Sequence, residues 1–376
     1  MTEIVISGSG VYNPPYSISN EELVSSYNAY ATKLNEGNAA EIELGNIEPI
    51  PLSSVEFIVK ASGIKNRFFM EGKGVVDPER LQVDLPEDPH GRDGKPNIMV
   101  KMALEAAMPA LKDANKNSED IDLIINAGSA VTRAIPSLAV EMQQELGATG
   151  FAYDMQMGCS GATFAIAQAI NAVETGLANV ALVVNPEYLE PLLNFKNRDS
   201  HFIFGSVGTA IIIEKRKTAT AKHQFKINST KLFTQFSQNI RAAFGSMALL
   251  DPEEVYSDEF LFQQKGKKVF KELLPLVVKH ITDHLEEKKL EPKKIRRMWL
   301  HQANINMNKF AAKKLLGHDP SQDESPIVLD QYGNTGGAGV VVAYHKHHKD
   351  LKSGDICLMS SFGAGYSIGS IIMEKI

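Results

Sequence analysis

Cysteine is scarce in this chain, because only Cys159 and Cys357 occur among its 376 residues. Two thiols cannot build a disulfide framework, and residues 1–4 do not open a charged and then apolar leader. We therefore expect a cytoplasmic protein in a reducing compartment. No apolar run approaches the roughly 20 residues that a membrane-spanning helix needs, so we expect no membrane insertion.

Positive charge is also in short supply. The formal net charge is −6 at pH 7, and the sequence contains no long basic tract. Because phosphate binding requires clustered Lys and Arg, the composition argues against a nucleic-acid surface and favours small molecules or proteins as partners. Apolar residues make up 43% of the chain. That content is enough to bury one large core or two fused ones.

The chain contains an internal duplication. In each copy a polar turn leads into an apolar strand, a helix ending in Leu-Gly follows, and a second strand comes next. These stretches are residues 118–127, 137–147 and 150–157 in the first copy and 291–301, 308–317 and 327–330 in the second. Strand and helix alternation within a repeat predicts an α/β protein whose two similar halves stack around a shared core.

We expect the first half to span residues 1–216 and the second half residues 217–376. Residues 30–97 break the rhythm, since they are polar and rich in Gly, Pro and Asp, and we interpret them as an insertion. Residues 225–270 are a second interruption with several aromatic and Met side chains, including Phe233, Phe236, Phe244 and Met247. That segment could cap a substrate tunnel or serve plain packing.

Cys159 stands between the strand over 150–157 and a helix of small residues that begins near Ser160. Unpaired N–H groups and the helix dipole favour a thiolate at such a position, so we expect a lowered pKa and a nucleophilic sulfur. His301 and Asn334 also follow apolar segments of the duplicated pattern. A Cys, a His and an Asn therefore all fall at predicted strand ends, where the two halves converge.

Four segments together resemble the signature of the β-ketoacyl-(acyl-carrier-protein) synthase III family. They are GCSGA at 158–162, HQAN at 301–304, GNTGG at 333–337 and SFGAG at 361–365. The resemblance implies a thiolase-like fold in layered αβαβα arrangement and a homodimer. It also implies decarboxylative Claisen condensation of an acyl thioester, such as acyl-CoA, with malonyl-acyl carrier protein in fatty acid biosynthesis.

The resemblance assigns a role to each site residue, and simple chemistry agrees. Cys159 would attack the acyl thioester, while the backbone N–H groups of Cys159 and Ala364 would stabilise the oxyanion. His301, neutral, and Asn334 would each donate to the enolate that forms when malonyl thioester loses carbon dioxide. Phe362 could present an apolar face to the malonyl carboxylate. We expect no metal and no cofactor.

Four positions depart from the family pattern. Where the family holds adenine with a Trp and an Arg, this chain has Phe57 and Ala61. An Arg after the His motif is replaced by Asn306, although the helix keeps Lys313 and Lys314 for an acidic carrier protein.

Ile135 stands where an aromatic residue of the neighbouring subunit closes the acyl pocket. Because Ile is shorter, we expect a deeper pocket and a medium-chain primer.

Other functions remain open at this stage. A Cys-His-Asn hydrolase shares the chain order, but its local Cys signature is absent. A condensing enzyme that joins acyl-CoA units or makes a specialised metabolite would need a carboxylate base near Cys159, and residues 126–130 offer none. A noncatalytic partner subunit need not retain the three site residues together. His345, His347 and His348 resemble a metal cluster, but we expect a solvated surface there.

Overall fold

The computed structural model describes residues 2–84, 95–242 and 261–376. Within them, nine strands form one sheet in the order β11-β12-β13-β8-β1-β7-β6-β4-β5. The first half contributes β1 (Ile4–Tyr12), β4 (Leu123–Asn126), β5 (Phe151–Asp154), β6 (Val180–Glu187) and β7 (Val207–Lys215). The second half contributes β8 (Phe225–Ser237), β11 (Ile295–Leu300), β12 (Ile356–Gly363) and β13 (Gly365–Lys375).

The duplication predicted from the sequence is visible in the strand pairing. In the first half β4 lies parallel to β5 and β6, and β7 returns antiparallel to β6. In the second half β11 and β12 are parallel, and β13 returns antiparallel to β12. The two halves join through a short antiparallel contact between β1 and β8. The expected boundary between residues 216 and 217 lies in the 3-10 turn Arg216–Thr218, between β7 and β8.

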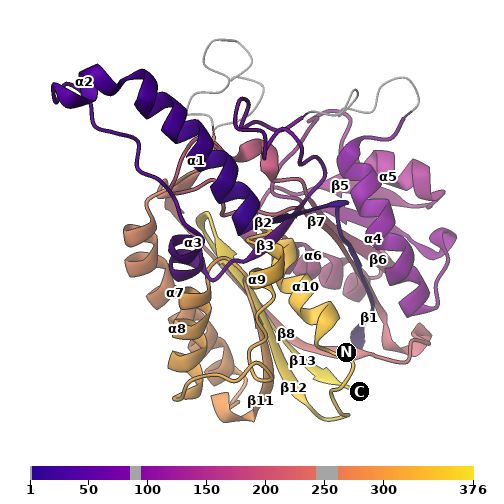
Figure 1. Cartoon of the computed structure of the whole chain (residues 1–376). Coiled ribbons are helices and arrows are strands. Elements are labelled where there is room, and N and C mark those ends of the chain that lie inside the picture. The colour runs from indigo at the N-terminus through magenta and orange to yellow at the C-terminus, as the bar shows by residue number, and fades with distance from the viewer. Residues whose placement is uncertain (1, 85–94, 243–260) are drawn as a thin grey trace.

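Helices complete a five-layer αβαβα arrangement, which Figure 1 shows from one side. The central layer consists of α6 (Gly161–Thr175) and α10 (Ala338–Lys346), which contact each other and strands of both halves. Outer layers are formed by α4 (Ile98–Ala114) with α5 (Leu138–Leu146) and by α7 (Gly266–Glu287) with α8 (Ile305–Leu316). Because α6 is buried on most sides and rich in Ala and Gly, both half-sheets can approach it closely.

One predicted strand of the second copy is wrong. Residues 327–330 do not form a strand, and the short helix α9 (Leu329–Tyr332) begins there instead. The physical reason is a side chain: Gln302 Oε1 accepts the N–H groups of Val328 and Leu329 at 3.0 and 3.3 Å. These donors are therefore satisfied without a neighbouring strand.

Residues 30–97 are not one irregular insertion. Before them comes β2 (Tyr16–Ser19), and α1 (Asn20–Gly37) extends into them. Within them lie α2 (Ala39–Glu43), α3 (Val55–Ser62) and β3 (Asn66–Phe69). Figure 1 shows α1 and α2 projecting from the body, whereas α3 and β3 lie against it. Arg67 of β3 is fully buried and donates to the Ile18 carbonyl, to Asn20 Oδ1 and to the Phe202 carbonyl. Residues 85–94 lie outside the described part.

The histidines at 345–348 differ from the expected solvated surface. His348 is 1% exposed and stacks on Tyr344 with ring centroids 4.7 Å apart. His345 Nδ1 lies 2.9 Å from Ser9 Oγ. Because the last turn of α10 packs against β1, these rings belong to the interior. In the described residues, no helix is long and apolar enough to cross a membrane.

Candidate functional site

Cys159 lies in the 3-10 turn Gly158–Ser160, directly before α6, as the sequence predicted. Hydrogen bonds hold this turn against the loop between β12 and β13. Ser160 Oγ donates to the Ser367 carbonyl at 2.9 Å, and the hydroxyls of Thr163 and Ser361 lie 2.6 Å apart. The start of α6 in the first half is thereby anchored to the Gly-rich turn of the second half.

Gly363 of that turn lies directly against the Cys159 side chain. A Cβ at position 363 would stand 2.5 Å from Cys159 Cβ and 2.9 Å from Sγ, closer than such atoms approach. The next residue is Ala364, and its backbone N–H together with that of Cys159 forms hydrogen bonds that lower the pKa of the thiol. Two backbone donors therefore converge on the sulfur, as an oxyanion site requires.

The expectation of a lowered thiol pKa is nevertheless wrong for this state of the protein. Burial and the nearby Glu187 carboxylate raise the pKa of Cys159 to about 11. Desolvation disfavours the thiolate by more than the two N–H groups stabilise it. The helix start can be recognised from the local sequence, whereas burial and the carboxylate of Glu187 on another strand depend on the folded structure.

His301 ends up in an apolar pocket at the end of β11. Its side chain is 3% exposed, and its ring meets that of Phe362 edge to face with centroids 5.4 Å apart. Burial lowers the pKa of His301 to about 4, so the imidazole is neutral at physiological pH. A neutral ring can donate one N–H to an oxygen that gains negative charge.

Asn334 is held by its backbone and by its own side-chain oxygen. Its N–H donates to the Ile203 carbonyl at 2.9 Å, its carbonyl accepts from Gly205 N–H, and Oδ1 accepts from Gly336 N–H at 3.1 Å. Since the oxygen is engaged within the loop, the NH₂ group is the end of the amide that can serve a ligand. Asn334 lines the large cavity described next.

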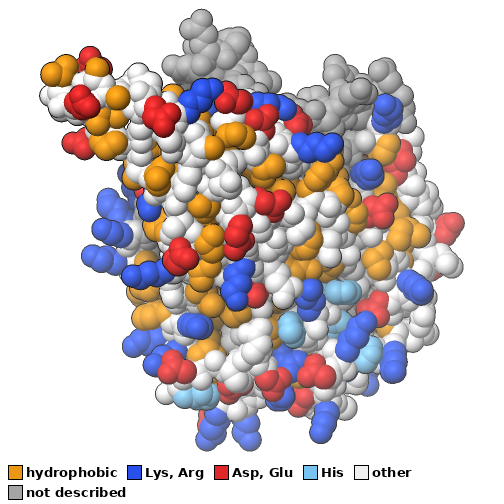
Figure 2. Space-filling view, in the orientation of Figure 1, with side chains coloured by type: hydrophobic (Ala, Val, Ile, Leu, Met, Phe, Trp, Pro, Cys, Tyr) orange, Lys and Arg blue, Asp and Glu red, His pale blue; other side chains and the backbone are white. Residues whose placement is uncertain are grey.

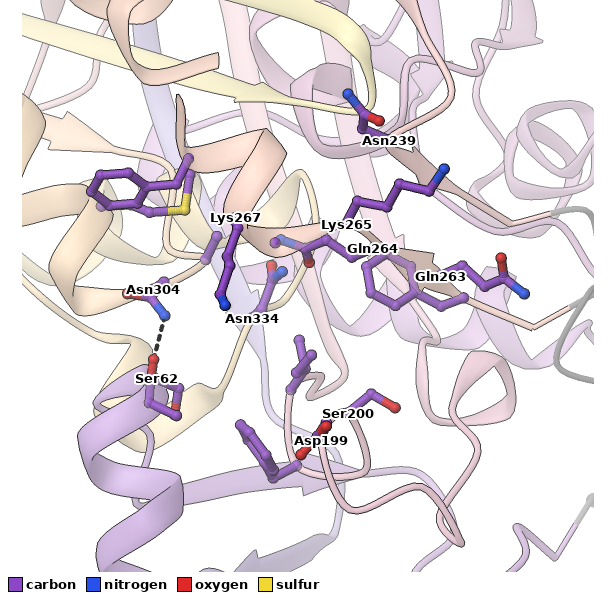
Figure 3. A pocket seen from close by; sticks show the side chains of 18 of the residues that line it. Ser62, Asp199, Ser200, Asn239, Gln263, Gln264, Lys265, Lys267, Asn304 and Asn334 are labelled. Carbon is purple, nitrogen blue, oxygen red and sulfur yellow. Dashed lines mark hydrogen bonds between the residues drawn. The ribbon is translucent and has the colours of Figure 1, made fainter. Parts of the chain in front are cut away.

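A cavity of about 1080 Å³ leads from the surface to Asn334. Its walls are rich in amide side chains, and Figure 3 shows several of them directed toward its interior. Among the lining residues are Asn194, Asn197, Gln238, Asn239, Gln263, Gln264, Asn304 and Asn306. Phe262 and Phe270 also line it, so part of the 225–270 segment does form a wall. Phe244 and Met247 lie outside the described residues.

Beside this cavity, but not among its lining residues, lies a stacked pair that the sequence did not reveal. The guanidinium of Arg198 lies 3.8 Å from the ring centroid of Phe57, and its Nε–H donates to the Leu52 carbonyl at 2.8 Å. Phe57 in turn meets Phe202, a cavity residue, edge to face. Arg198 thus supplies beside Phe57 the guanidinium that Ala61 lacks. No local signal in its loop distinguishes this Arg from a surface residue.

Basic side chains form part of the cavity wall and of the surface near it. Lys265 and Lys267 line the cavity, whereas the predicted Lys313 and Lys314 lie farther along α8. Lys313 pairs with Asp319 at 2.9 Å, and Lys314 lies over the Phe310 ring. Figure 2 shows Lys and Arg side chains gathered along the edge of the molecule that α7 and α8 form. In the sequence, the run QQKGKK at 263–268 contains the lysines that line the cavity.

Ile135 does not reach the cavity of its own chain. Its side chain is 86% exposed, in the loop between β4 and α5. A residue that serves a neighbouring subunit would be exposed in this way in a single chain.

Glu187 is the polar residue that the sequence reasoning missed. It ends the buried strand β6, is fully buried, and lies close enough to Cys159 to raise the pKa of that thiol. The only sequence signal was an acidic residue completing an apolar run.

Comparisons with known proteins agree on one family. Residues 153–235 match the model described as 3-Oxoacyl-[acyl-carrier-protein (ACP)] synthase III, and residues 285–375 match the model of its C terminal. The chain is 47% identical over 352 residues to the beta-ketodecanoyl-[acyl-carrier-protein] synthase of Pseudomonas aeruginosa, covering 94% of this chain and 100% of that protein.

Two further similarities extend over almost the whole chain. The beta-ketoacyl-[acyl-carrier-protein] synthase III of Bordetella petrii is 30% identical over 376 residues, with 99% and 98% of the two chains covered. The crystal structure of 3-oxoacyl-[acyl-carrier-protein] synthase III from Aquifex aeolicus VF5 gives a TM-score of 0.75 at 23% identity, with both chains fully covered. This last similarity supports the thiolase-like fold predicted from the sequence.

Proposed function

The chain belongs to the β-ketoacyl-ACP synthase III family of condensing acyltransferases, and we propose that its primer is a medium-chain acyl thioester near eight carbons. The main support is the name of the relative that is 47% identical to this chain, because that name specifies a β-ketodecanoyl product. Such a ten-carbon product requires a primer two carbons shorter, because malonyl contributes two carbons after decarboxylation. The aliphatic Ile135 supports the same assignment.

In the first half-reaction, Cys159 Sγ forms a bond to the acyl carbon and the thiol of the donor leaves. Negative charge develops on the carbonyl oxygen, where the N–H groups of Cys159 and Ala364 can stabilise it. The thiol must lose its proton during the attack, and its raised pKa makes deprotonation costly before the substrate binds. The released donor thiolate can take up that proton, so the step balances without an added reactant.

In the second half-reaction, malonyl thioester loses carbon dioxide and leaves an enolate. His301 and Asn334 each have a donor available for the enolate oxygen, since the imidazole is neutral and the amide oxygen is engaged by Gly336. The apolar ring of Phe362 beside His301 disfavours a malonyl carboxylate and so favours its release. The enolate carbon then attacks the acyl group, and Cys159 leaves as the thiolate.

The cavity supports delivery of both substrates on a pantetheine arm. An amide-rich wall can bind the two amide groups of such an arm without fixing a charge. Lys265 and Lys267 in the cavity wall suit the phosphates of acyl-CoA and the acidic surface of an acyl carrier protein. The Phe57 and Arg198 pair offers a flat surface against which adenine can stack.

We also propose a homodimer. The strand β5 lies at the end of the sheet, and its outer edge has no partner strand among the described residues. An open edge invites pairing with a second copy of the same strand. Dimer formation would cover this edge and could bring the exposed Ile135 of one subunit to the acyl pocket of the other.

The residues described here carry out each step of the proposed reaction, so we propose that it needs neither metal nor organic cofactor. Both cysteines are free thiols, which supports the cytoplasmic location expected from the sequence. Glu187 is a carboxylate near Cys159, the kind of base that head-to-head condensation of acyl-CoA units would need, and burial raises its pKa to about 7. The name of the 47% identical relative, a β-ketodecanoyl synthase, favours decarboxylative condensation over that alternative.

The test is a competition among primers. Purified protein is incubated with an equimolar series of acetyl- to dodecanoyl-CoA without a malonyl donor, and the mass added to Cys159 is measured by intact and peptide mass spectrometry. We expect an octanoyl adduct to dominate, and the Cys159→Ala variant, the matched control, to carry none. Condensation with malonyl-ACP should show the same order. A clear preference for acetyl-CoA in both assays would refute the medium-chain assignment.

A further inference from the structure

Glu187 connects the two halves of the protein next to Cys159. Its Oε1 accepts from Ser129 Oγ–H at 2.9 Å and from Gly337 N–H at 2.8 Å, while Oε2 accepts from Ser129 N–H at 2.9 Å. Ser129 lies in the loop after β4, whereas Gly337 precedes α10 of the second half. A single buried carboxylate therefore bridges two loops that are far apart in the sequence.

The second of these loops carries Asn334. Gly336, the residue before the one bound by Glu187, donates its N–H to Asn334 Oδ1 at 3.1 Å. The loop also lies tightly against the carboxylate, since a Cβ on Gly336 would stand 2.9 Å from Glu187 Oε1. One hydrogen bond of Glu187 is thus separated from the Asn334 amide by a single residue and one further hydrogen bond.

We propose that Glu187 is a positioning residue, whose carboxylate ties the loop at 333–337 to Ser129 and thereby fixes Asn334 for malonyl decarboxylation. The proposal rests on the role of Asn334 given above and extends it to a residue that does not touch substrate. A tie is needed because three of the five residues at 333–337 are Gly, with Gly336 at φ +54°. Such a loop loses its geometry easily, and a donor displaced by about 1 Å can cost 10²-fold in rate.

The negative charge of Glu187 also affects the pKa of the Cys159 thiol. Burial raises the pKa of Glu187 to about 7, against the hydrogen bonds from Ser129, Gly337 and Ala338 that lower it. The start of α10 also favours the carboxylate through its helix dipole. Because the negative charge of Glu187 raises the pKa of Cys159, removing that charge should ease thiolate formation. Loss of Glu187 should therefore impair the two half-reactions unequally.

Glu187→Gln is the informative variant. Both carboxylate oxygens accept a backbone N–H, and an amide has only one oxygen, so the Gln side chain must turn its NH₂ toward Ser129 N–H or Gly337 N–H. One backbone hydrogen bond of the bridge is then lost while side-chain volume is preserved. The matched control is Glu214→Gln, because Glu214 is equally buried. Among the described residues, the partners of Glu214 are Lys116 and Thr218, and neither they nor their neighbours in the chain bond to the Asn334 loop.

The experiment measures two rates on each full-length variant: single-turnover acylation of Cys159 by octanoyl-CoA, and malonyl-ACP decarboxylation. For Glu187→Gln we expect decarboxylation to fall about 10- to 100-fold while acylation is kept or becomes faster. Glu214→Gln should change neither rate by more than about threefold. Ser129→Ala removes only the hydroxyl donor, so it should lower decarboxylation by a smaller factor and leave acylation unchanged. This variant decides the question if Glu187→Gln does not fold.

Two results would overturn the proposal: normal decarboxylation, or an equal loss of both rates, which marks a merely structural carboxylate. Asn334→Ala is measured alongside as the reference. If that variant decarboxylates normally, the role of Asn334 itself is wrong. If Asn334→Ala is impaired and Glu187→Gln is not, only the positioning role of Glu187 fails.

Discussion

The ring of His301 meets the ring of Phe362 edge to face, with centroids 5.4 Å apart and planes 80° from parallel. The contact keeps the imidazole in apolar surroundings, and burial lowers the pKa of His301 to about 4. The residue that we propose as a hydrogen-bond donor to the enolate is therefore neutral before substrate arrives.

This arrangement predicts separate effects on the two half-reactions. His301→Ala and Asn334→Ala should each lower malonyl-ACP decarboxylation and condensation by about 10²–10³, the usual effect of losing one oxyanion donor. Acylation of both variants by octanoyl-CoA should remain, because Cys159 and the Ala364 N–H are intact. Intact mass spectrometry checks the adduct, and release of carbon dioxide checks the second step. Unimpaired decarboxylation in both variants would contradict the assigned roles.

The raised thiol pKa predicts how Cys159 reacts with pH. Burial and the Glu187 charge hold the pKa at about 11, so the thiolate fraction in the free enzyme grows about tenfold per pH unit below that value. Alkylation of Cys159 by iodoacetamide should therefore keep accelerating from pH 7 to pH 10. Peptide mass spectrometry separates it from Cys357, whose buried thiol is the internal control. A plateau below pH 8 would show a thiolate already formed at neutrality.

Gly363 should tolerate no side chain. In Gly363→Ala the new Cβ would overlap Cys159, so we expect a loss of about 1–3 kcal/mol in stability and strongly reduced acylation. Denaturant unfolding and the adduct assay measure the two effects. Gly37→Ala is the matched control, because a Cβ there meets nothing within 4 Å at the end of α1. Equal behaviour of the two variants would refute the close approach.

The basic side chains that line the cavity should set carrier-protein affinity. Lys267→Glu should raise the KM for malonyl-ACP by about fivefold and leave kcat near its original value, because Lys267 lines the cavity and Cys159 is not among the lining residues. Added salt should shrink the difference. Lys112→Glu, an exposed reversal on α4, serves as the control. A fall in kcat without a change in KM would argue against a docking role.

Ile135 should control primer length across the dimer. Ile135→Phe should lower the ratio of octanoyl-CoA to acetyl-CoA turnover by about tenfold or more, because a ring shortens the pocket that Ile leaves open. Leu177→Phe adds the same ring at another exposed site and should leave the ratio unchanged. An unchanged ratio in Ile135→Phe would show that this loop does not reach the neighbouring pocket.

Sequence motifs predicted most of the fold and also named the candidate reacting residues, whose roles stay predictions. The α/β halves, the turn carrying Cys159 and the strand leading to His301 follow from apolar periodicity and helix stop signals, which act between neighbours in the chain. The strand predicted at 327–330 failed for the opposite reason. Its N–H groups are satisfied by Gln302, a side chain about 25 residues earlier, and no local pattern records that contact.

The sequence by itself identified the candidate reacting residues, because Cys159, His301 and Asn334 stand in short motifs whose spacing along the chain is sufficient to recognise them. Only the tertiary structure decided the chemical state and the support of those residues. The raised pKa of Cys159, the neutral His301 and the bridging Glu187 depend on burial and on charges from distant strands. Desolvation and contacts between the two halves exist only after the chain has folded, so these properties could not be predicted from local sequence.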